Sequence, residues 1–456
     1  MKIQLNNRPV LRELDDGLVL CRSQADDVDA LAEFNARIHS DFGFDTPDER
    51  VGVWTRDLLT RPHPTFHPDD CTLVVEAATG KIISSMNLIS QTWAYEGIPF
   101  GVGRPELVGT LPEYRNRGLV RLQFEEIHKW SAERGELVQG ITGIPFYYKL
   151  FGYEMGMELD GGRMGFEALL PKLKEGESEP FTFRPATEAD IPFLMEVYAH
   201  ACRRRLITCV RDEAVWRYDL AGQSEKNVDR LEFRIIHRAE DGEPVGYLAH
   251  PWYNWNWGLG ARHYELQPGV SWLEVTPSVA RYLWQTGETY SKRDGRPPVR
   301  TAYGFWFGSS HPSYEVFRDR LPRLRDPYAW YVRVPDLPKF IRRIAPALER
   351  HIAESVIVGY SGSVQISFYR SGLKLAFERG RLSAAEPWQP LPKDVGQAAF
   401  PDLSFLQLVF GYRTIEELEQ SYADCWYNGD ERRADETRLL LNTLFPKKAS
   451  SVMMVN

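Results

Sequence analysis

The chain has 456 residues with 43% hydrophobic and 12% aromatic residues, which is too long for one compact core and predicts two or three domains. Its formal net charge of −8, without any long lysine or arginine run, argues against a nucleic-acid partner. No stretch approaches the roughly 18 consecutive apolar residues that a membrane span needs. We therefore expect neither nucleic acid nor membrane as a partner.

The N-terminal segment and the cysteines indicate a reducing compartment. The first residues, MKIQLNNRPV, contain no apolar signal region, so we expect a cytoplasmic protein. The cysteines are odd in number, scattered and without a CxxC pair: Cys21, Cys71, Cys202, Cys209 and Cys425. This pattern favours free thiols over disulfides.

Strand and helix patterns alternate over the first part of the chain. Residues 18–22 (LVLCR) have the pattern of a strand, and an acidic turn at Asp26-Asp27 then opens a helix. Apolar residues recur in that helix at helical spacing, at Val28, Leu31, Phe34 and Ile38. Residues 71–77 and 82–89 are predicted strands on either side of a Thr79-Gly80 turn.

The middle of the chain echoes the beginning. Residues 173–180 are charged and predict a linker. The pattern Asp27-Val28-x-x-Leu31 then returns as Asp190-Ile191-x-x-Leu194, each time after a strand that ends in arginine. The offset of 163 residues is a plausible domain length, so the echo predicts a tandem repeat of one fold, although strand–cap–helix openings are common.

A third block begins near Pro335. Apolar residues alternate over 364–368 and again over 373–377, with Ser371-Gly372 between them, which predicts a hairpin. Residues 405–409 are predicted to be helical, and Thr414 with Glu417 forms a capping box for a further helix. We expect a separate α+β domain here.

The most informative stretch is residues 107–135. A predicted strand at 107–111 leads through Pro112 into a loop with Arg115, Arg117 and Gly118, and a helix follows at once. A helix N-terminus offers unpaired N–H groups and a positive dipole end, which together hold phosphate. A glycine lets the phosphate approach the backbone, and arginines add charge. The alternative is a solvated basic start of a helix.

Residues 112–120, PEYRNRGLV, resemble the cofactor motif of the GNAT acetyltransferases, Q/R-x-x-G-x-G/A. Arg115 and Gly118 fill the first and fourth positions, whereas Val120 departs from the small last residue. A second match is Tyr-x-x-Phe-Gly-Tyr at 148–153. The resemblance implies acetyl-CoA as cosubstrate and the following cofactor-binding residues: Val108, Gly109, Thr110, Arg115, Asn116, Arg117, Gly118, Leu119, Val120 and Arg121.

The order of the motifs and the long C-terminal part resemble the enhanced-intracellular-survival (Eis) type of this family. That resemblance implies a mixed α/β, or α+β, fold class: a catalytic GNAT domain (1–165), a degenerate GNAT domain (181–334) and a sterol-carrier-protein-like domain (335–456). It also implies a homo-oligomer, with a hexamer as one expectation. Residues 270–287 are interpreted as strand, proline and helix without the arginine–glycine loop, which predicts one active site per chain.

Acetyl transfer to an amine needs a proton acceptor, because an amine of pKa about 10.4 is only about one part in 10³ neutral at pH 7. The leaving thiol, of pKa near 8.5, benefits from an acid. The resemblance assigns Tyr148 as that acid, with a core aromatic as the alternative. It assigns the base to the terminal carboxylate of Asn456, although the tail SVMMVN lacks the expected aromatic ending. The alternative is a frayed end.

The acceptor implied is the primary amine of a cationic molecule: an aminoglycoside, a polyamine or a lysine-like group. Four acids could attract it, namely Asp41, Asp45, Asp48 and Glu49, but solvated loop acids are the favoured interpretation. The competing function is a non-catalytic acyl-CoA or lipid carrier that uses the third domain.

Three other patterns are interpreted as structural. The cluster His63, His67, Asp69, Asp70 and Cys71 lies among prolines and favours a rigid loop over a metal site, so we expect no metal. The aromatic run at 252–257 favours structure or an oligomer contact over a ligand groove. Residues 359–362 are no nucleophile elbow, because the second glycine directly follows the serine.

Overall fold

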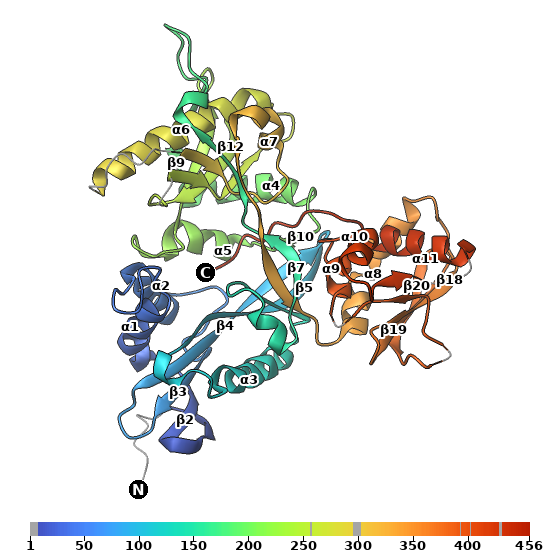
Figure 1. The fold of residues 1–456 in the computed structure, drawn as a ribbon. Coiled ribbons are helices and arrows are strands. Elements are labelled where there is room, and N and C mark those ends of the chain that lie inside the picture. The colour runs from blue at the N-terminus through green and yellow to red at the C-terminus, as the bar shows by residue number, and fades with distance from the viewer. Residues whose placement is uncertain (1–7, 256–257, 295–301, 393, 402, 428–430) are drawn as a thin grey trace.

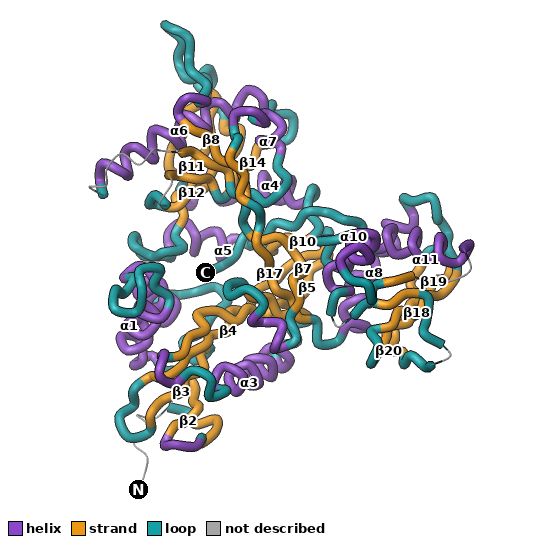
Figure 2. Tube along the Cα trace, in the orientation of Figure 1, coloured by secondary structure: helices purple, strands orange, loops and turns teal. Residues whose placement is uncertain are grey.

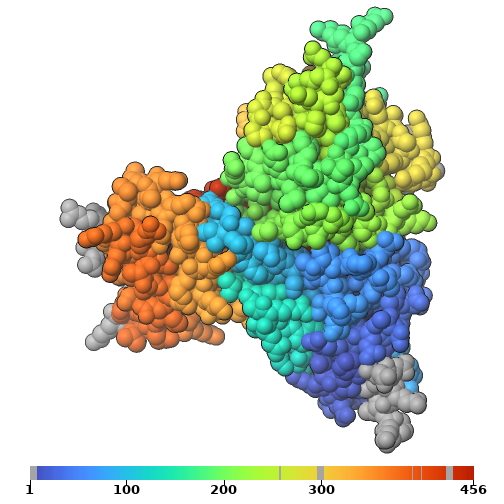
Figure 3. All heavy atoms as spheres, turned by 180° about the vertical axis from the view of Figure 1, so that it is seen from behind, coloured from blue at the N-terminus to red at the C-terminus, as the bar shows by residue number. Residues whose placement is uncertain are grey.

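Three lobes follow one another along the chain in the computed structural model, which describes residues 8–255, 258–294, 302–392, 394–401, 403–427 and 431–456 (Figure 1). Seen from behind, the first lobe lies beneath the second and the third projects to one side (Figure 3). The C-terminus returns to the junction of the first two lobes. None of the helices described is long and apolar enough to cross a membrane.

The first lobe is an α/β unit built on one long, mainly antiparallel sheet with the order β1-β2-β3-β4-β5-β6-β17-β7. Helices α1 and α2 pack on one face with Leu73 and Ile83, and α3 packs on the other with Met86 and Leu88. The elements are β1 (Val10–Glu13), β2 (Leu18–Arg22), α1 (Val28–Ile38), α2 (Glu49–Thr60), β3 (Cys71–Glu76), β4 (Ile82–Tyr95), β5 (Ile98–Thr110), α3 (Leu119–Glu133), β6 (Val138–Ile141) and β7 (Glu154–Leu159).

The second lobe repeats this path. Its elements are β9 (Phe181–Pro185), α4 (Ile191–Cys202), β10 (Ile207–Cys209), α5 (Glu213–Arg217), β11 (Leu231–Arg238), β12 (Pro244–Pro251), β13 (Gly258–Ala261), β14 (His263–Leu266), α6 (Trp272–Arg293), β15 (Ala302–Phe305), α7 (Pro312–Val316) and β16 (Arg323–Arg325). The repeated sequence pattern corresponds to the same structure, a capped helix after a strand, in both units. Capping boxes, Gln24 with Asp27 and Thr187 with Asp190, precede α1 and α4. The predicted repeat has this structural basis.

The two units exchange their last strands. Strand β8 (Gly162–Phe166) leaves the first unit and pairs with β15 and β16 of the second. Strand β17 (Tyr328–Arg333) leaves the second unit and lies between β6 and β7 of the first (Figure 2). The predicted boundaries at 165 and 334 are therefore corrected, because hydrogen bonding assigns each of these strands to the other unit's sheet. A sequence boundary cannot follow a strand that pairs across it.

Two element predictions differ from the structure. The short strand expected at 107–111 is the end of the 13-residue strand β5. Residues 270–287, interpreted as strand, proline and helix, instead contribute to one long helix, α6, with Pro277 inside its N-terminal part. Pro277 is the sixth residue of α6, so it removes only the one N–H that would bond to the Leu273 carbonyl four residues earlier, and the helix continues past it.

The third lobe is an α+β unit that shares a hydrophobic core with the first sheet, where Trp93 and Phe100 join Phe340 of α8. Its elements are α8 (Leu337–Ala353), β18 (Gly362–Ser367), β19 (Gly372–Glu378), β20 (Arg381–Trp388), β21 (Ala398–Ala399), α9 (Phe405–Val409), α10 (Ile415–Ser421), β22 (Trp426–Tyr427) and α11 (Glu431–Leu444). The predicted hairpin (β18–β19), the helix at 405–409 and the capping box at Thr414 are confirmed.

The C-terminal tail leaves α11 and pairs with the second unit on its way to the first. Leu206 donates its N–H to Ala449, and Ser451 donates to Ile207, both at 2.9 Å. These partners lie in or beside β10, which itself pairs with β4. The tail thus extends the first unit's sheet, and residues 452–456 reach the junction of the first two lobes (Figure 1).

Candidate active site

The predicted phosphate loop lies where β5 leads into α3. Gly118 has φ +75° and Asn116 has φ +63°, so the chain makes a left-handed turn directly before the helix. The first helical hydrogen bond runs from Leu122 to Gly118 at 3.1 Å. The N–H groups of the first turn therefore face outward with the positive end of the helix dipole. A Cβ at Gly118 would meet nothing within 4 Å, so the turn is open to a ligand.

Three exposed arginines surround this turn. Arg115 donates from Nε to the Thr110 carbonyl at 3.3 Å, which ties the loop to the end of β5. Arg117 forms an ion pair with Asp16 and lies 5.3 Å from the centre of the Tyr114 ring. Arg121 lies 5.1 Å from the ring of Phe151. The structure brings all the predicted loop residues, 115–121, to one exposed corner.

Strands β5 and β6 separate just before this corner. They pair in parallel only at Val102 with Val138 and at Gly103 with Gln139, and β5 then continues to Thr110 beside β4. Between Glu106 and Gly109 the register shifts, and Leu107 has φ +49°. This is a β-bulge, a feature that redirects backbone groups beside active sites. The separation leaves an edge of β5 to which an extended ligand can bind.

Gly109, predicted to contact the cofactor, has a structural role in the fold. Its carbonyl accepts a hydrogen bond from Ser84 at 2.6 Å. A Cβ at this position would stand 2.6 Å from Cγ2 of Ile38 in α1. The glycine at 109 is therefore needed for the close packing of α1 on β5. Its neighbour Val108 remains half-buried.

Tyr148 lies in a short 3₁₀ helix (Tyr147–Phe151) between β6 and β7. Its side chain is 4% exposed and packs edge-on against Phe124 and Tyr331. Burial raises the pKa of Tyr148 well above its usual value, and the nearby Glu106 carboxylate adds to the shift. The phenol is therefore protonated at neutral pH and can donate a hydrogen bond. A Cβ on Gly143 would stand 3.5 Å from its hydroxyl oxygen.

Glu106 and His39 also lie beside the bulge, and no sequence pattern singles out Glu106. Glu106 Oε2 pairs with Arg104 Nη2 at 2.6 Å, and the Arg104 side chain is 1% exposed. Burial lowers the pKa of His39, opposed by Glu106 and by a hydrogen bond with the backbone of Leu107. A neutral histidine, a carboxylate and a protonated phenol thus surround the end of β5.

The C-terminal tail connects to this group through Arg104. The Val455 carbonyl accepts from Arg104 Nη1 at 3.3 Å and from Gln91 Nε2 at 2.9 Å. A terminal oxygen of Asn456 accepts from Gln223 Nε2 at 3.0 Å. The tail is held by side chains of both units, so the last residue has a defined position at the junction.

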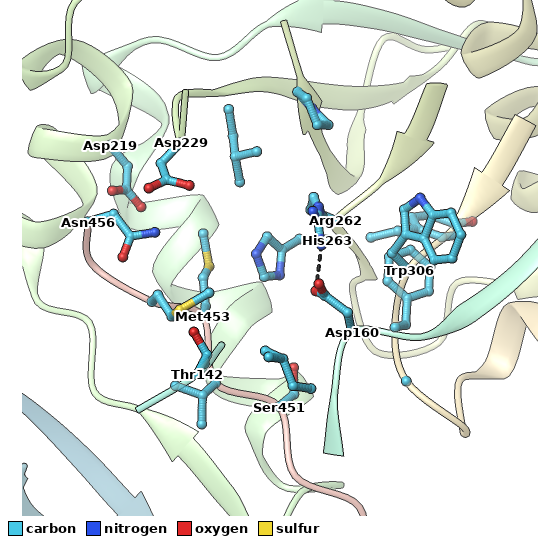
Figure 4. Close-up of a pocket in the computed structure, with 18 of the residues that line it drawn as sticks. Thr142, Asp160, Asp219, Asp229, Arg262, His263, Trp306, Ser451, Met453 and Asn456 are labelled. Carbon is cyan, nitrogen blue, oxygen red and sulfur yellow. Dashed lines mark hydrogen bonds and ion pairs between the residues drawn. The ribbon is translucent and has the colours of Figure 1, made fainter. Parts of the chain in front are cut away.

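A cavity of about 340 Å³ opens at this junction, and Asn456 lines it (Figure 4). Thr142, at the end of β6, forms part of its wall on the side of the first unit, whereas Asp219, Asp229 and Trp306 come from the second unit. In Figure 4 the side chains of Asp219, Asp229 and Asn456 gather at one end of the cavity. Tyr148 does not line it, but Gly143, which adjoins Thr142, faces the Tyr148 hydroxyl.

The charges of the cavity are unevenly paired. Asp219 pairs with the buried Arg211, which also donates to the Met453 carbonyl of the tail at 2.9 Å. Asp160 pairs with Arg262. Burial raises the pKa of Asp229 to about 6, and Arg104 only partly offsets this. Asp229 is enclosed by protein yet accessible from the cavity, so a cation that enters would stabilise its charged form.

The acids expected at residues 41–49 lie elsewhere. Asp41, Asp45 and Glu49 are exposed or nearly so, and Asp48 caps α2 by accepting from the Arg50 N–H at 3.0 Å. The interpretation as solvated acids thus agrees with Asp41, Asp45 and Glu49, whereas Asp48 is buried and has a structural role as a helix cap. The acids that line the cavity come instead from the second unit, at positions that no sequence pattern singled out.

The patterns interpreted as structural have structural partners. Asp70 pairs with Arg134, His67 pairs with Asp69, and His63 packs against Tyr218 of the second unit with ring centres 4.5 Å apart. Within the described ranges, no group of three metal-ligating side chains comes together. Of the aromatic run, Trp252 donates to the Asn227 carbonyl at 2.8 Å and packs within the second unit. Tyr253 and Trp255, by contrast, line the cavity, so the interpretation of the run as no part of a ligand groove is corrected for these two residues. Residues 256 and 257 lie outside the described residues.

Comparison with known proteins agrees with this geometry. Residues 27–156 match the family model of the acetyltransferase (GNAT) domain. This region is similar to a GNAT domain. It comprises α1 to the start of β7, so it contains the left-handed turn at Gly118, the bulge and Tyr148. A search of curated protein sequences gives no match.

Solved structures share the fold over nearly the whole chain. A GCN5-related N-acetyltransferase from Kribbella flavida superposes with a TM-score of 0.62 at 17% identity and covers 96% of this chain and 100% of its own. One from Anabaena variabilis gives 0.62 at 12%, covering 95% and 99%. Eis1 from Mycobacterium abscessus gives 0.55 at 12%, covering 96% and 100%. The predicted fold class, mixed α/β with tandem GNAT folds, is confirmed.

Proposed function

We propose that the protein is an acetyl-CoA-dependent N-acetyltransferase that acts on the primary amine of a cationic acceptor. The observation that carries the proposal is the left-handed turn at Gly118, open to solvent at the start of α3 beside the separation of β5 from β6. A helix N-terminus of this form binds phosphate, and an open strand edge binds an amide-containing chain. Coenzyme A presents both, joined in that order.

The residues at the end of β5 then suit acyl transfer. The acceptor nitrogen forms a bond to the acetyl carbon, the carbon–sulfur bond breaks, and the sulfur leaves with the electron pair. Tyr148, whose phenol is protonated at neutral pH, can donate its hydroxyl hydrogen to that sulfur. The proton lost by the nitrogen needs an acceptor, for which we propose the terminal carboxylate of Asn456. It lines the cavity in which Asp219 and Asp229 offer negative charge to an amine.

Release of free thiol from acetyl-CoA tests the proposal, with a polyamine, an aminoglycoside and a lysine-containing peptide as acceptors. We expect release that depends on the acceptor, and a loss of about 10²-fold in kcat for Tyr148→Phe with the Kd of acetyl-CoA unchanged. A short extension after Asn456 should abolish turnover. Full activity in both variants would remove both assignments.

The same assay separates the enzyme from the alternative, a lipid or acyl-CoA carrier. No thiol release with any acceptor, together with tight binding of a fatty acid or acyl-CoA, would favour the carrier. The likeness of the third lobe to sterol carrier proteins, the cytoplasmic location and the homo-oligomer, with a hexamer among its forms, remain predictions of the sequence.

A further inference from the structure

The loop that carries Tyr148 is hydrogen-bonded to the exchanged strand β17. The N–H of Phe146 donates to the hydroxyl oxygen of Tyr331 at 2.7 Å, although 185 residues separate the two. The hydroxyl of Tyr328, also on β17, donates to the same oxygen at 3.1 Å. Tyr331 is 1% exposed, and its ring centre lies 5.8 Å from that of Tyr148. One phenol oxygen of the second unit thus accepts from the backbone of the first unit's loop.

This hydrogen bond falls on a strained residue. Phe146 has φ +66°, in the left-handed region that bulky L-residues avoid because Cβ approaches the carbonyl oxygen. Its side chain is 69% exposed, so packing of the ring does not account for the conformation. The bond from its N–H is the long-range contact at this residue that can offset the strain. Tyr148 follows only two residues later.

The register of β17 places Tyr331 at the base of the loop. Tyr331 pairs with Ile141, the last residue of β6, and with Met155, the second residue of β7. The loop therefore leaves the sheet on one side of Tyr331 and returns on the other. At its far end Lys149 pairs with Glu154 at 2.8 Å, and Glu154 also accepts from Gln407 of the third lobe at 3.2 Å. All three lobes hold the loop.

We propose that Tyr331 is a positioning residue for Tyr148. Its hydroxyl fixes the left-handed turn at Phe146 and so directs the Tyr148 hydroxyl toward the place where the leaving sulfur forms. The role rests on the proposed acetyl transfer. Through the strand exchange, the second unit, whose described residues form no such glycine turn directly before a helix, positions a reacting group of the first unit.

Tyr331→Phe tests the inference, since it removes the hydroxyl and keeps the ring. We expect kcat to fall about tenfold while the Kd of acetyl-CoA changes less than about twofold. In a Tyr148→Phe background the same substitution should cause no further loss, because the group that it positions is gone. Independent, multiplying losses would overturn the positioning role.

Amide hydrogen exchange of residues 143–151 in the full-length chain gives a readout that does not depend on turnover. We expect faster exchange in Tyr331→Phe, and a smaller increase in Tyr328→Phe, which serves if the first variant folds poorly. Tyr198→Phe is the matched control, because its hydroxyl donates to a backbone carbonyl, that of Cys209 at 2.7 Å, within the second unit. Unchanged exchange in the loop would overturn the inference. If the wild-type chain transfers no acetyl group, the proposed function fails, and the exchange rates still decide whether Tyr331 holds the loop.

Discussion

The two α/β units follow the same path but differ where a parallel pair of strands meets a helix. In the first unit, the parallel strands β5 and β6 form two residue pairs and then separate. In the second unit, the parallel strands β13 and β15 form four residue pairs, from Gly258 with Ala302 to Ala261 with Phe305. Before α3 stands the left-handed Gly118, and no acid lies in its first turn. Before α6 stands Ser271, and Glu274 lies in the first turn. An acid there opposes the helix dipole's attraction for phosphate.

The open strand edge and the left-handed glycine turn directly before a helix, which we propose to bind phosphate, thus occur together in the first unit. Neither occurs among the described residues of the second unit, yet that unit supplies Asp219, Asp229 and Trp306 to the cavity and β17 to the first sheet. On the proposed function, the second unit keeps the fold and provides walls and supports for the site of the first. The four predictions below test this division of roles, from the largest expected effect to the smallest.

The largest effect is expected for Gly118→Glu. The new carboxylate would lie at the N-terminus of α3, where it repels the pyrophosphate, so we expect the Kd of coenzyme A, measured by calorimetry, to rise about 100-fold or more. The matched control is Gly269→Glu, since Gly269 precedes α6 with φ +83° and, like Gly118, has nothing within 4 Å of an added Cβ. Equal losses in both variants would mean that backbone strain, not anion binding, is responsible.

The second effect concerns the cavity. Asp229→Asn removes a carboxylate that is mostly charged at neutral pH. We therefore expect the KM of a cationic acceptor to rise about tenfold with the Kd of acetyl-CoA unchanged. Since the pKa of Asp229 is raised to about 6, the wild-type KM should also rise as the pH falls through that value. The exposed Asp241→Asn, in a turn of the same unit, is the control. An unchanged acceptor KM would exclude this end of the cavity as the amine site.

The third prediction concerns the contact between the units at His63. Burial lowers the pKa of His63 to about 3. Between about pH 3 and about pH 6.5 the unfolded chain therefore binds a proton that the folded chain does not. His63 therefore contributes stability above pH 6.5 that is lost as the pH falls. The free energy of unfolding of the wild type should fall between about pH 7 and about pH 5. Allowing for the partial exposure of His63, we expect this fall to be about 1 kcal/mol smaller in His63→Asn.

Urea unfolding of wild type and variant at the two pH values measures this difference. Comparing the change with pH in each protein, and not their stabilities at one pH, removes the cost of the lost packing against Tyr218. Parallel pH dependence in the two proteins would show that His63 can take up a proton without unfolding.

The smallest effect is expected for Asp16→Asn. Asp16 pairs with Arg117 of the phosphate turn, and both side chains are partly or largely exposed, so the pair is weak and competes with a bound phosphate. Releasing Arg117 should lower the Kd of acetyl-CoA about twofold at low salt and by less at high salt. Calorimetry at two salt concentrations measures this. A weaker affinity would mean that the pair is needed to hold the turn in place.

Much of the architecture could be predicted from the sequence because it depends on local patterns. The opening of each unit, the hairpin and the capping box of the third lobe, and the glycine turn before α3 all rest on spacings within a few residues. The interpretation of residues 270–287 as strand, proline and helix is wrong, because a proline predicts a boundary and Pro277 instead lies inside α6. The bulge at Leu107 and the role of Glu106 beside it left no pattern to detect.

The sequence by itself determined the α/β repeat, the glycine turn before α3 and the tyrosine that follows β6, since each is encoded in neighbouring residues. Only the tertiary structure decided which strand of each unit pairs with the other unit's sheet. It also decided that Asn456, Asp219 and Asp229 line one cavity, and that Tyr331 is hydrogen-bonded to the Tyr148 loop. Pairings between residues that are 185 or more positions apart depend on how whole sheets and lobes pack, and no local spacing carries that information.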